Sequence, residues 1–563
     1  MKKIMQFLIF IALAFFSATC SKKTNDDKMK EQNEINSLKS KISQYANAYI
    51  TYDETALDSN RRKIVELFYR AGKIIDTLFL KQAYSKNLEI LAELKKSQKE
   101  LDKLRLKYFE INFGPFDRFD DDKPFIGDLQ KPMGANFYPD DMTREEFENF
   151  IKNNPEKEQD FKSEFTMIRR QNGNLIAIPY SEFYKKELTE LNRILVEASA
   201  FAEDQTLKNY LIKRAEDFLK NDYYESDIAW MDLQDPLIEI VIGPYEVYEE
   251  KLFNYKAAFE MFLTIVDKEE TNKLKLFESY LPAIEKNLPL ADKYKKFGSR
   301  GLESPIKVVN LIYSAGDTKA GSQTLAFNLP NDERVRKVKG SKKVMMKNIH
   351  EAKFEKILKP IAQKIIDSSQ LPLVAFEAFF NHTLMHEISH GVGPGIIQKN
   401  WKTTEVKKEL KETYSKIKEC KADILGMYNN AFLIDKNVYP KEFEKNIYVT
   451  FLAGIFRSSR FGINSAHGAC NAIIFNYLLE KGAYFYDEKN QRLSVNFDKI
   501  RETIRELANL ILTVQAEGNY EAAKIIIDKY GVESETMKKI QKKIVDIPID
   551  IKPIFQIEKG SNL

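Results

Sequence analysis

The spacing of apolar residues divides the chain into helical and strand-like stretches. Apolar residues recur three and four positions apart in Ile64, Leu67 and Phe68, which is the spacing of an amphipathic helix. Segments with this spacing are Ile35–Tyr108, Glu182–Lys220, Lys251–Lys296, most of Lys347–Leu479, and Ile500–Val545. Helices are therefore expected to form most of the protein.

Several shorter stretches have the pattern of strands. Pro236–Tyr248 alternates between apolar and polar residues, and Ile306–Tyr313 is rich in β-branched residues. Leu325–Pro330 is a short extended piece closed by proline, and Ile547–Ile554 alternates near the end of the chain. Strands interspersed among many helices predict an α+β fold.

The length of 563 residues is too great for one hydrophobic core. We expect two lobes, a mostly helical one and a mixed one with a small β-sheet or barrel, with an active-site cleft between them. The predicted mixed lobe covers 37–262 and 301–340, the helical lobe 263–300 and 341–545, and an extended tail, 546–563, returns to the mixed lobe.

The first residues have the pattern of an export signal. Lys2 and Lys3 precede a short apolar run over 4–16, which is too short to span a bilayer comfortably. The run ends at Cys20, which polar residues follow, and this junction resembles a bacterial lipoprotein signal. The resemblance implies a signal peptide over 1–19, a lipid anchor on Cys20, a tether over 20–36 and a place in the cell envelope, with the outer membrane preferred. A larger residue than usual, Thr19, precedes the cysteine, so a plain signal peptide or an uncleaved anchor stays open.

Composition and charge indicate which kinds of molecule the protein is expected to bind. Hydrophobic residues make up 43% and charged residues 30% of the chain, which is ordinary for a globular protein. The formal net charge of +4 is near balance for this length, so nucleic acid is not expected as a partner. The two later cysteines, Cys420 and Cys470, are expected to be unpaired core residues.

A metal-binding pentapeptide provides the strongest chemical signal. His386 and His390 are four residues apart in a predicted helix, so both imidazoles can face one metal ion. Glu387 lies beside them, where a zinc hydrolase places its general base. Three of the five histidines of the chain lie within Asn381–Gly391, which chance explains poorly.

A catalytic zinc normally takes a third protein ligand. One extension of the motif places it six residues after the second histidine, but that position is Ile396. The alternative is an acidic residue on a later helix. Over Lys411–Asn430 two acidic residues, Glu419 and Asp423, are four apart on one face, so that one can bind metal while the other orients a histidine.

Together the segments His386–His390 and Glu419–Asp423 resemble the dipeptidyl peptidase III family. Most members have one extra residue between the histidines, and a bacterial branch has the shorter form seen here. The resemblance implies that His386, His390 and Glu419 bind zinc, that Glu387 is the general base, and that Asp423 supports a ligand from behind. Lysines stand at two positions of the second motif, Lys418 for a glutamate and Lys421 for an arginine.

Three further segments extend this resemblance. Glu239, Asn328 and Asn331 match family residues that bind substrate, and His467 matches a histidine expected to stabilise the oxyanion. One departure is Val241, where the family often has a tyrosine that donates a hydrogen bond in the transition state. Either of two nearby tyrosines is an alternative donor, namely Tyr245 or Tyr248.

The expected activity is that of a zinc-dependent exopeptidase, with one Zn²⁺ per chain, that releases dipeptides from the free N-terminus of short peptides. A zinc endopeptidase with the same chemistry is one alternative. A lipoprotein that binds peptides with weak turnover is the other, since Val241 and Lys418 depart from the family pattern.

Overall fold

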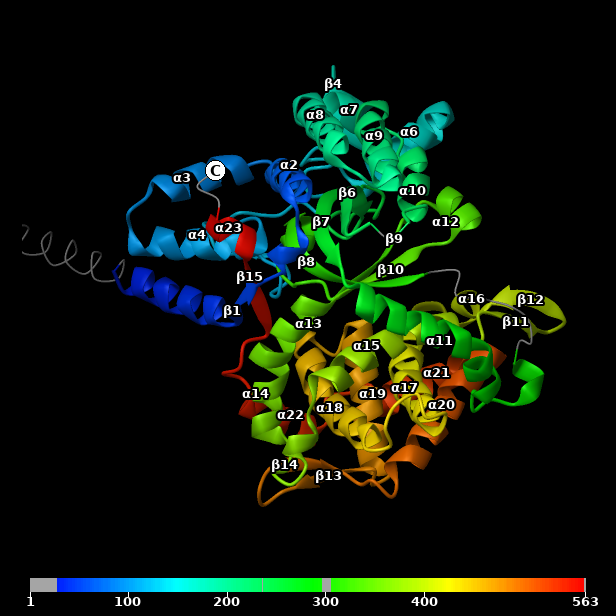
Figure 1. Cartoon of the computed structure of the whole chain (residues 1–563). Helices are drawn as coiled ribbons and strands as arrows, with labels where there is room; N and C mark the ends of the chain where they lie inside the picture. Colours follow the sequence, from blue (N-terminus) through cyan, green and yellow to red (C-terminus); the bar gives the residue numbers. More distant parts are fainter. Residues whose placement is uncertain (1–27, 235, 296–304, 561–563) are drawn as a thin grey trace, which may run out of the picture.

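The computed structural model describes residues 28–234, 236–295 and 305–560. The predicted signal peptide and Cys20 lie outside these ranges. The described chain forms two lobes, as expected: one holds the largest sheet and its covering helices, and the other is almost entirely helical (Figure 1). Among the helices of the described residues, none is both long enough and apolar enough to cross a bilayer.

The sheet of the mixed lobe has five strands in the order β6-β7-β8-β10-β9. Its strands are β6 (Ile238–Glu246), β7 (Ala258–Val266), β8 (Ile306–Gly316), β10 (Lys342–Met346) and β9 (Ala326–Leu329). Neighbours are antiparallel except β10, which runs parallel to β8. Within the described residues β6 and β9 are the two edges, so this is an open sheet and not a closed barrel.

One predicted helix is wrong in its first half. Over Lys251–Lys296 the chain forms strand β7 before the helix α11 (Lys268–Asn287) begins. All nine residues of β7 are buried, so the strand has no polar face and shows no alternation in the sequence. The mixed lobe was predicted to end at residues 262 and 340, but its sheet extends past both positions. Strand β7 continues beyond 262, and β10 lies beyond 340.

Helices cover this sheet. On the side away from the helical lobe lie α2 (Ser59–Ala83), α8 (Lys185–Phe201), α9 (Gln205–Lys220) and α10 (Tyr224–Met231) (Figure 1). Helix α2 packs on β7 and β8 at Gly72, where a Cβ atom would lie 2.7 Å from the ring of Tyr313. The smaller elements of this lobe are α3 (Asn87–Lys96), α4 (Glu100–Asn112), β2 (Phe116–Asp117), β3 (Lys123–Pro124), α5 (Arg144–Asn153), α6 (Glu158–Lys162), β4 (Thr166–Gln171), β5 (Asn174–Pro179), α7 (Tyr180–Phe183) and α12 (Glu333–Lys339).

Both ends of the described chain meet beside the mixed lobe. Strand β15 (Asp550–Phe555) pairs in parallel with β1 (Tyr45–Ile50), so the extended tail does return to this lobe. The predicted tether over 20–36 needs correction, because residues 28–43 form a helix. Ile35 on that helix is buried against Tyr108, and a tether would leave it in water.

The helical lobe holds the metal-binding motif at its centre. Helix α15 (Phe376–Gly391) packs on α17 (Tyr414–Asp435) and α18 (Phe443–Ser458), and α17 also contacts α19 (Ala466–Glu480) and α20 (Ile500–Glu517). The other elements of this lobe are α13 (Lys347–Lys353), α14 (Lys359–Ile365), β11 (Ile396–Lys399), β12 (Lys402–Glu405), α16 (Val406–Leu410), β13 (Tyr484–Asp487), β14 (Arg492–Val495), α21 (Tyr520–Tyr530) and α22 (Glu535–Lys543); α23 (Gln556–Gly560) follows β15.

Candidate metal centre

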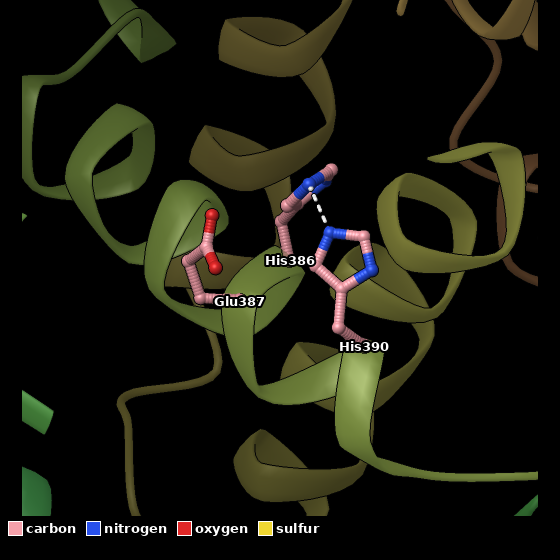
Figure 2. A group of neighbouring side chains, drawn as sticks. All are labelled: His386, Glu387 and His390. Carbon is pink, nitrogen blue, oxygen red and sulfur yellow. Dashed lines mark hydrogen bonds between the residues drawn. The ribbon is translucent and has the colours of Figure 1, made fainter. Parts of the chain in front are cut away.

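Three helices of the helical lobe bring the predicted ligands and His467 together. His386 and His390 are one turn apart on α15, Glu419 comes from α17, and His467 lies in the first turn of α19. Figure 2 shows the two α15 imidazoles turned towards each other, with Glu387 beside them. A side-chain oxygen of Glu387 lies within 4.8 Å of one nitrogen of each ring.

The distances between donor atoms fit a tetrahedral metal ion. The Nε2 atoms of His386 and His390 are 3.1 Å apart, and Glu419 Oε2 lies 3.4 Å and 3.5 Å from them. Zinc binds nitrogen and oxygen at about 2.0–2.1 Å in tetrahedral geometry, which places neighbouring ligand atoms about 3.4 Å apart. The three donor atoms therefore surround a position where one zinc ion fits.

Glu419 supports the same conclusion through its unpaired oxygen. Its Oε2 atom is buried and accepts no hydrogen bond from the described residues. A buried carboxylate oxygen without a partner is costly, and a metal ion is one way to satisfy it. Burial alone would raise the pKa of Glu419, but the two facing histidines hold it well below its usual range. This carboxyl group is therefore ionised, as a metal ligand must be.

Behind the predicted ligands, Asp423 contacts the ring of His386. The ring Nδ1 donates to Asp423 Oδ1 at 2.6 Å, which leaves Nε2 facing the other ligands. The second carboxylate oxygen accepts a hydrogen bond from the Cys470 thiol at 3.0 Å. Burial would lower the pKa of His386, but the Asp423 carboxylate outweighs it and raises that pKa to about 10. The same negative field favours a metal cation.

A third histidine of the motif, His382, joins this support, and its role was not predicted. Its Nε2 atom lies 3.3 Å from Asp423 Oδ1, and its ring packs 4.4 Å from that of Phe451. His382 is four residues before His386, so the helical spacing already placed both on one face. Cys420 and Cys470 are buried and unpaired, as expected.

At the end of α15, Lys421 holds the chain in place. Its buried Nζ atom donates to the carbonyl of Val392 at 2.7 Å and to that of His390 at 3.2 Å. The last carbonyls of a helix lack partners within it, and a cation there also suits the helix dipole. Burial lowers the pKa of Lys421 to about 7. This lysine, where the family pattern has arginine, therefore still supports the segment that carries His390.

The predicted general base has a basic neighbour from the other lobe. Burial would raise the pKa of Glu387, but His386 and Lys343 lower it on balance, so the carboxylate is ionised. The Lys343 Nζ atom lies 3.6 Å from Glu387 Oε2. No local pattern predicts this contact, because its two residues are 44 positions apart.

At the rim of the cluster lies His467. Its side chain is 60% exposed, and its Nδ1 atom lies 3.5 Å from Glu419 Oε2. Together with His386 and Glu419 it forms a second group whose donor atoms lie within 4.8 Å of one another. An exposed imidazole next to the ligands can reach a substrate as well as the metal position.

The three predicted substrate residues do not form one cluster. Glu239 is buried, and its two oxygens lie 2.8 Å from Lys342 Nζ and 3.0 Å from Lys307 Nζ. Asn328 is exposed on the edge strand β9, while Asn331 Nδ2 donates to the carbonyl of Tyr245 at 3.0 Å. In the described chain no hydrogen bond joins Glu239 to either asparagine.

Neither nearby tyrosine clearly replaces the hydrogen-bond donor that the family often has at the position of Val241. Val241 is a buried core residue of β6. Tyr245 is also buried, with its ring 5.5 Å from the guanidinium of Arg214, whereas Tyr248 is 73% exposed. The basic group from the sheet lobe that lies beside Glu387 is Lys343.

Comparison with known proteins agrees with this geometry. Residues 140–405, which include His386–His390, match the model of peptidase family M49. A solved structure of DPP III from Caldithrix abyssi is 65% identical, covers 92% of this chain and 99% of its own, and superposes with a TM-score of 0.91. The chain belongs to peptidase family M49.

A second solved member, dipeptidyl-peptidase III from Corallococcus sp. strain EGB, shares 40% identity over 93% of this M49 peptidase and 98% of its own chain, with a TM-score of 0.80. A protein of Arabidopsis thaliana called Nudix hydrolase 3 is 38% identical over 579 residues, covering 93% of this chain and 74% of that protein. Part of the plant protein thus has no counterpart here, and its name describes that protein alone. Family M49 implies a metal, and the cluster of histidines and Glu419 is a candidate site for it.

Proposed function

We propose that this M49 peptidase is a zinc-dependent exopeptidase that releases dipeptides from the free N-terminus of short peptides. The observation that carries the proposal is the set of three donor atoms 3.1–3.5 Å apart on two packed helices. Two solved proteins named as dipeptidyl peptidase III, with the same fold over more than nine tenths of this chain, support the choice of exopeptidase.

The chain holds the metal with residues from two helices. His386 and His390 contribute Nε2 atoms, Glu419 contributes a carboxylate oxygen, and Asp423 orients His386 from behind. One zinc ion per chain fits this donor set, and nitrogen with oxygen donors suits zinc. When bound, zinc polarises a carbonyl group and lowers the pKa of a water molecule.

Two side chains act on the substrate in this proposal. The ionised Glu387 carboxylate accepts a proton from the attacking water and delivers it to the nitrogen of the leaving peptide. The exposed imidazole of His467 donates a hydrogen bond to the oxygen on which negative charge develops. Both groups lie on helices of the helical lobe, Glu387 on α15 and His467 on α19.

The substrate is proposed to lie along β9. This strand is an edge of the sheet in the described chain, so a peptide can add to it as a further strand. Asn328 and Asn331 then contact the residues before the cleaved bond. Glu239 belongs to this proposal as the counter-charge for the free amine, and that role requires the substrate ammonium to compete with Lys342 or Lys307.

Location is also a proposal, and it rests on the sequence alone. The basic start, the short apolar run and Cys20 support export, with a signal peptide over 1–19 and a lipid anchor. The anchor is proposed to hold the enzyme in the bacterial cell envelope, at the outer membrane. Labelling of Cys20 by a fatty-acid analogue tests this, and a Cys20→Ala variant is the control.

The decisive experiment compares one peptide with and without an acetyl group on its N-terminus. Purified protein with zinc should release a dipeptide from the free peptide and nothing from the acetylated one. Equal cleavage of both peptides would favour an endopeptidase. Tight binding of the free peptide without cleavage would favour a peptide-binding lipoprotein.

A further inference from the structure

One residue of the sheet lobe makes direct contact with the residue proposed as general base. Lys343 lies in β10, and its side chain crosses to α15 of the helical lobe. The Nζ atom donates a hydrogen bond to the main-chain carbonyl of Glu387 and lies 3.6 Å from that residue's Oε2 atom. A single ammonium group therefore contacts both the backbone and the carboxylate of Glu387.

Burial makes this contact specific. Lys343 is 8% exposed. Among the described residues, the carboxylate that lies within 4.0 Å of its Nζ atom is that of Glu387. A buried lysine is unfavourable unless a carboxylate compensates for the loss of water. Burial lowers the pKa of Lys343 and Glu387 opposes that shift, so the two charges stabilise each other.

The neighbouring lysine shows that this arrangement is selective. Lys342 and Lys343 are adjacent, so their side chains point to opposite faces of β10. Lys342 pairs with Glu239 at 2.8 Å, while Lys343 reaches Glu387. Each buried lysine thus compensates a different carboxylate, and neither can replace the other without a shift in strand register.

The same residue also faces the proposed substrate strand. In the antiparallel pairing of β10 with β9, Lys343 is the partner of Asn328. Lys343 therefore links the strand proposed to bind peptide with the side chain proposed to accept its proton. The other groups around the Glu387 carboxylate, His386 and His390, belong to the helical lobe alone.

From these contacts we infer that Lys343 is a positioning residue: it holds the Glu387 carboxylate at the angle and distance needed for proton transfer. The inference rests on the proposed role of Glu387 as general base. Without the ammonium group, Glu387 is free to adopt other rotamers. A misplacement of about 1 Å in such a group costs on the order of 100-fold in rate.

The test uses the full-length protein loaded with zinc and a free peptide. Lys343→Met should lower kcat by about 10- to 100-fold with KM changed less than about threefold, since the residue acts through Glu387. Zinc content should remain one per chain. Lys343→Arg restores the positive charge and should recover a large share of kcat. The control is Lys347→Met, which breaks the ion pair of Lys347 with Asp267 at a distance from Glu387 and should leave kcat unchanged.

Lys343→Gln provides a second neutral variant, because an amide can still donate to the Glu387 carbonyl. It should also lose kcat, and it replaces the methionine variant if that one does not fold. Wild-type kcat in either folded neutral variant would overturn the inference, and so would a loss of zinc, which would make Lys343 a scaffold residue. If the wild-type protein itself releases no dipeptide, the proposed function fails before this comparison begins.

Discussion

Two glutamates of this protein, one in each lobe, have opposite surroundings. Glu419 faces histidine nitrogens, and its Oε2 atom accepts no hydrogen bond within the described chain, whereas Glu239 has both oxygens paired with lysines. Glu419 therefore keeps a carboxylate oxygen that can bind a cation, while both oxygens of Glu239 are already occupied. The comparison teaches that burial alone does not make an acidic side chain a metal ligand. What matters is whether its oxygens already have partners.

The largest expected effect is on catalysis at the candidate metal centre, beside Glu419. Glu387→Gln removes the proton acceptor but keeps the size of the side chain, so kcat should fall by about 1,000-fold. Metal analysis should still find one zinc per chain, because His386, His390 and Glu419 are unchanged. Turnover near the wild-type rate would refute Glu387 as the base.

The next largest effect concerns Glu239 in the sheet lobe, and it is an effect on the stability of the fold. Glu239→Gln removes the carboxylate that pairs with both Lys342 and Lys307, which should lower the free energy of unfolding by about 3–5 kcal/mol. Chemical denaturation measures it. The control Glu270→Gln breaks the more exposed pair with Lys347 and should cost less than about 1 kcal/mol. A raised KM with unchanged stability would instead assign Glu239 to the substrate amine.

Support from behind the ligands should have a smaller effect. Asp423→Asn weakens the hydrogen bond that orients His386, so zinc affinity should fall by about 10- to 100-fold. Competition with a chelating dye measures the Kd. Cys470→Ser keeps a donor for the second oxygen of Asp423 and should bind zinc like the wild type. An unchanged Kd in the asparagine variant would remove Asp423 from the metal site.

The smallest expected effect tests whether the substrate peptide binds along β9. Asn328→Ala removes one exposed amide from β9, so KM should rise by about 2- to 12-fold while kcat is retained. Steady-state kinetics on a free peptide measure both constants. Asn490→Ala, in an exposed turn of the helical lobe, is the matched control. Unchanged KM would move the peptide away from β9.

Sequence alone determined the parts of this protein that depend on local spacing. The i, i+4 positions of His386 and His390, and of Glu419 and Asp423, fix side chains on one helix face whatever surrounds them. The patterns also predicted the strands β6, β8 and β9 and the separation into two lobes. Strand β7 was missed because burial on both faces removes the alternation that reveals a strand.

Only the tertiary structure decided which charges meet. Glu239 is paired with lysines from two other strands, and Glu387 receives Lys343 from the opposite lobe. Cys470 and His382 reach Asp423 in the same way, through the packing of three helices. These contacts join residues far apart in the chain, and the free energy of burying a charge depends on such partners, which no local pattern contains.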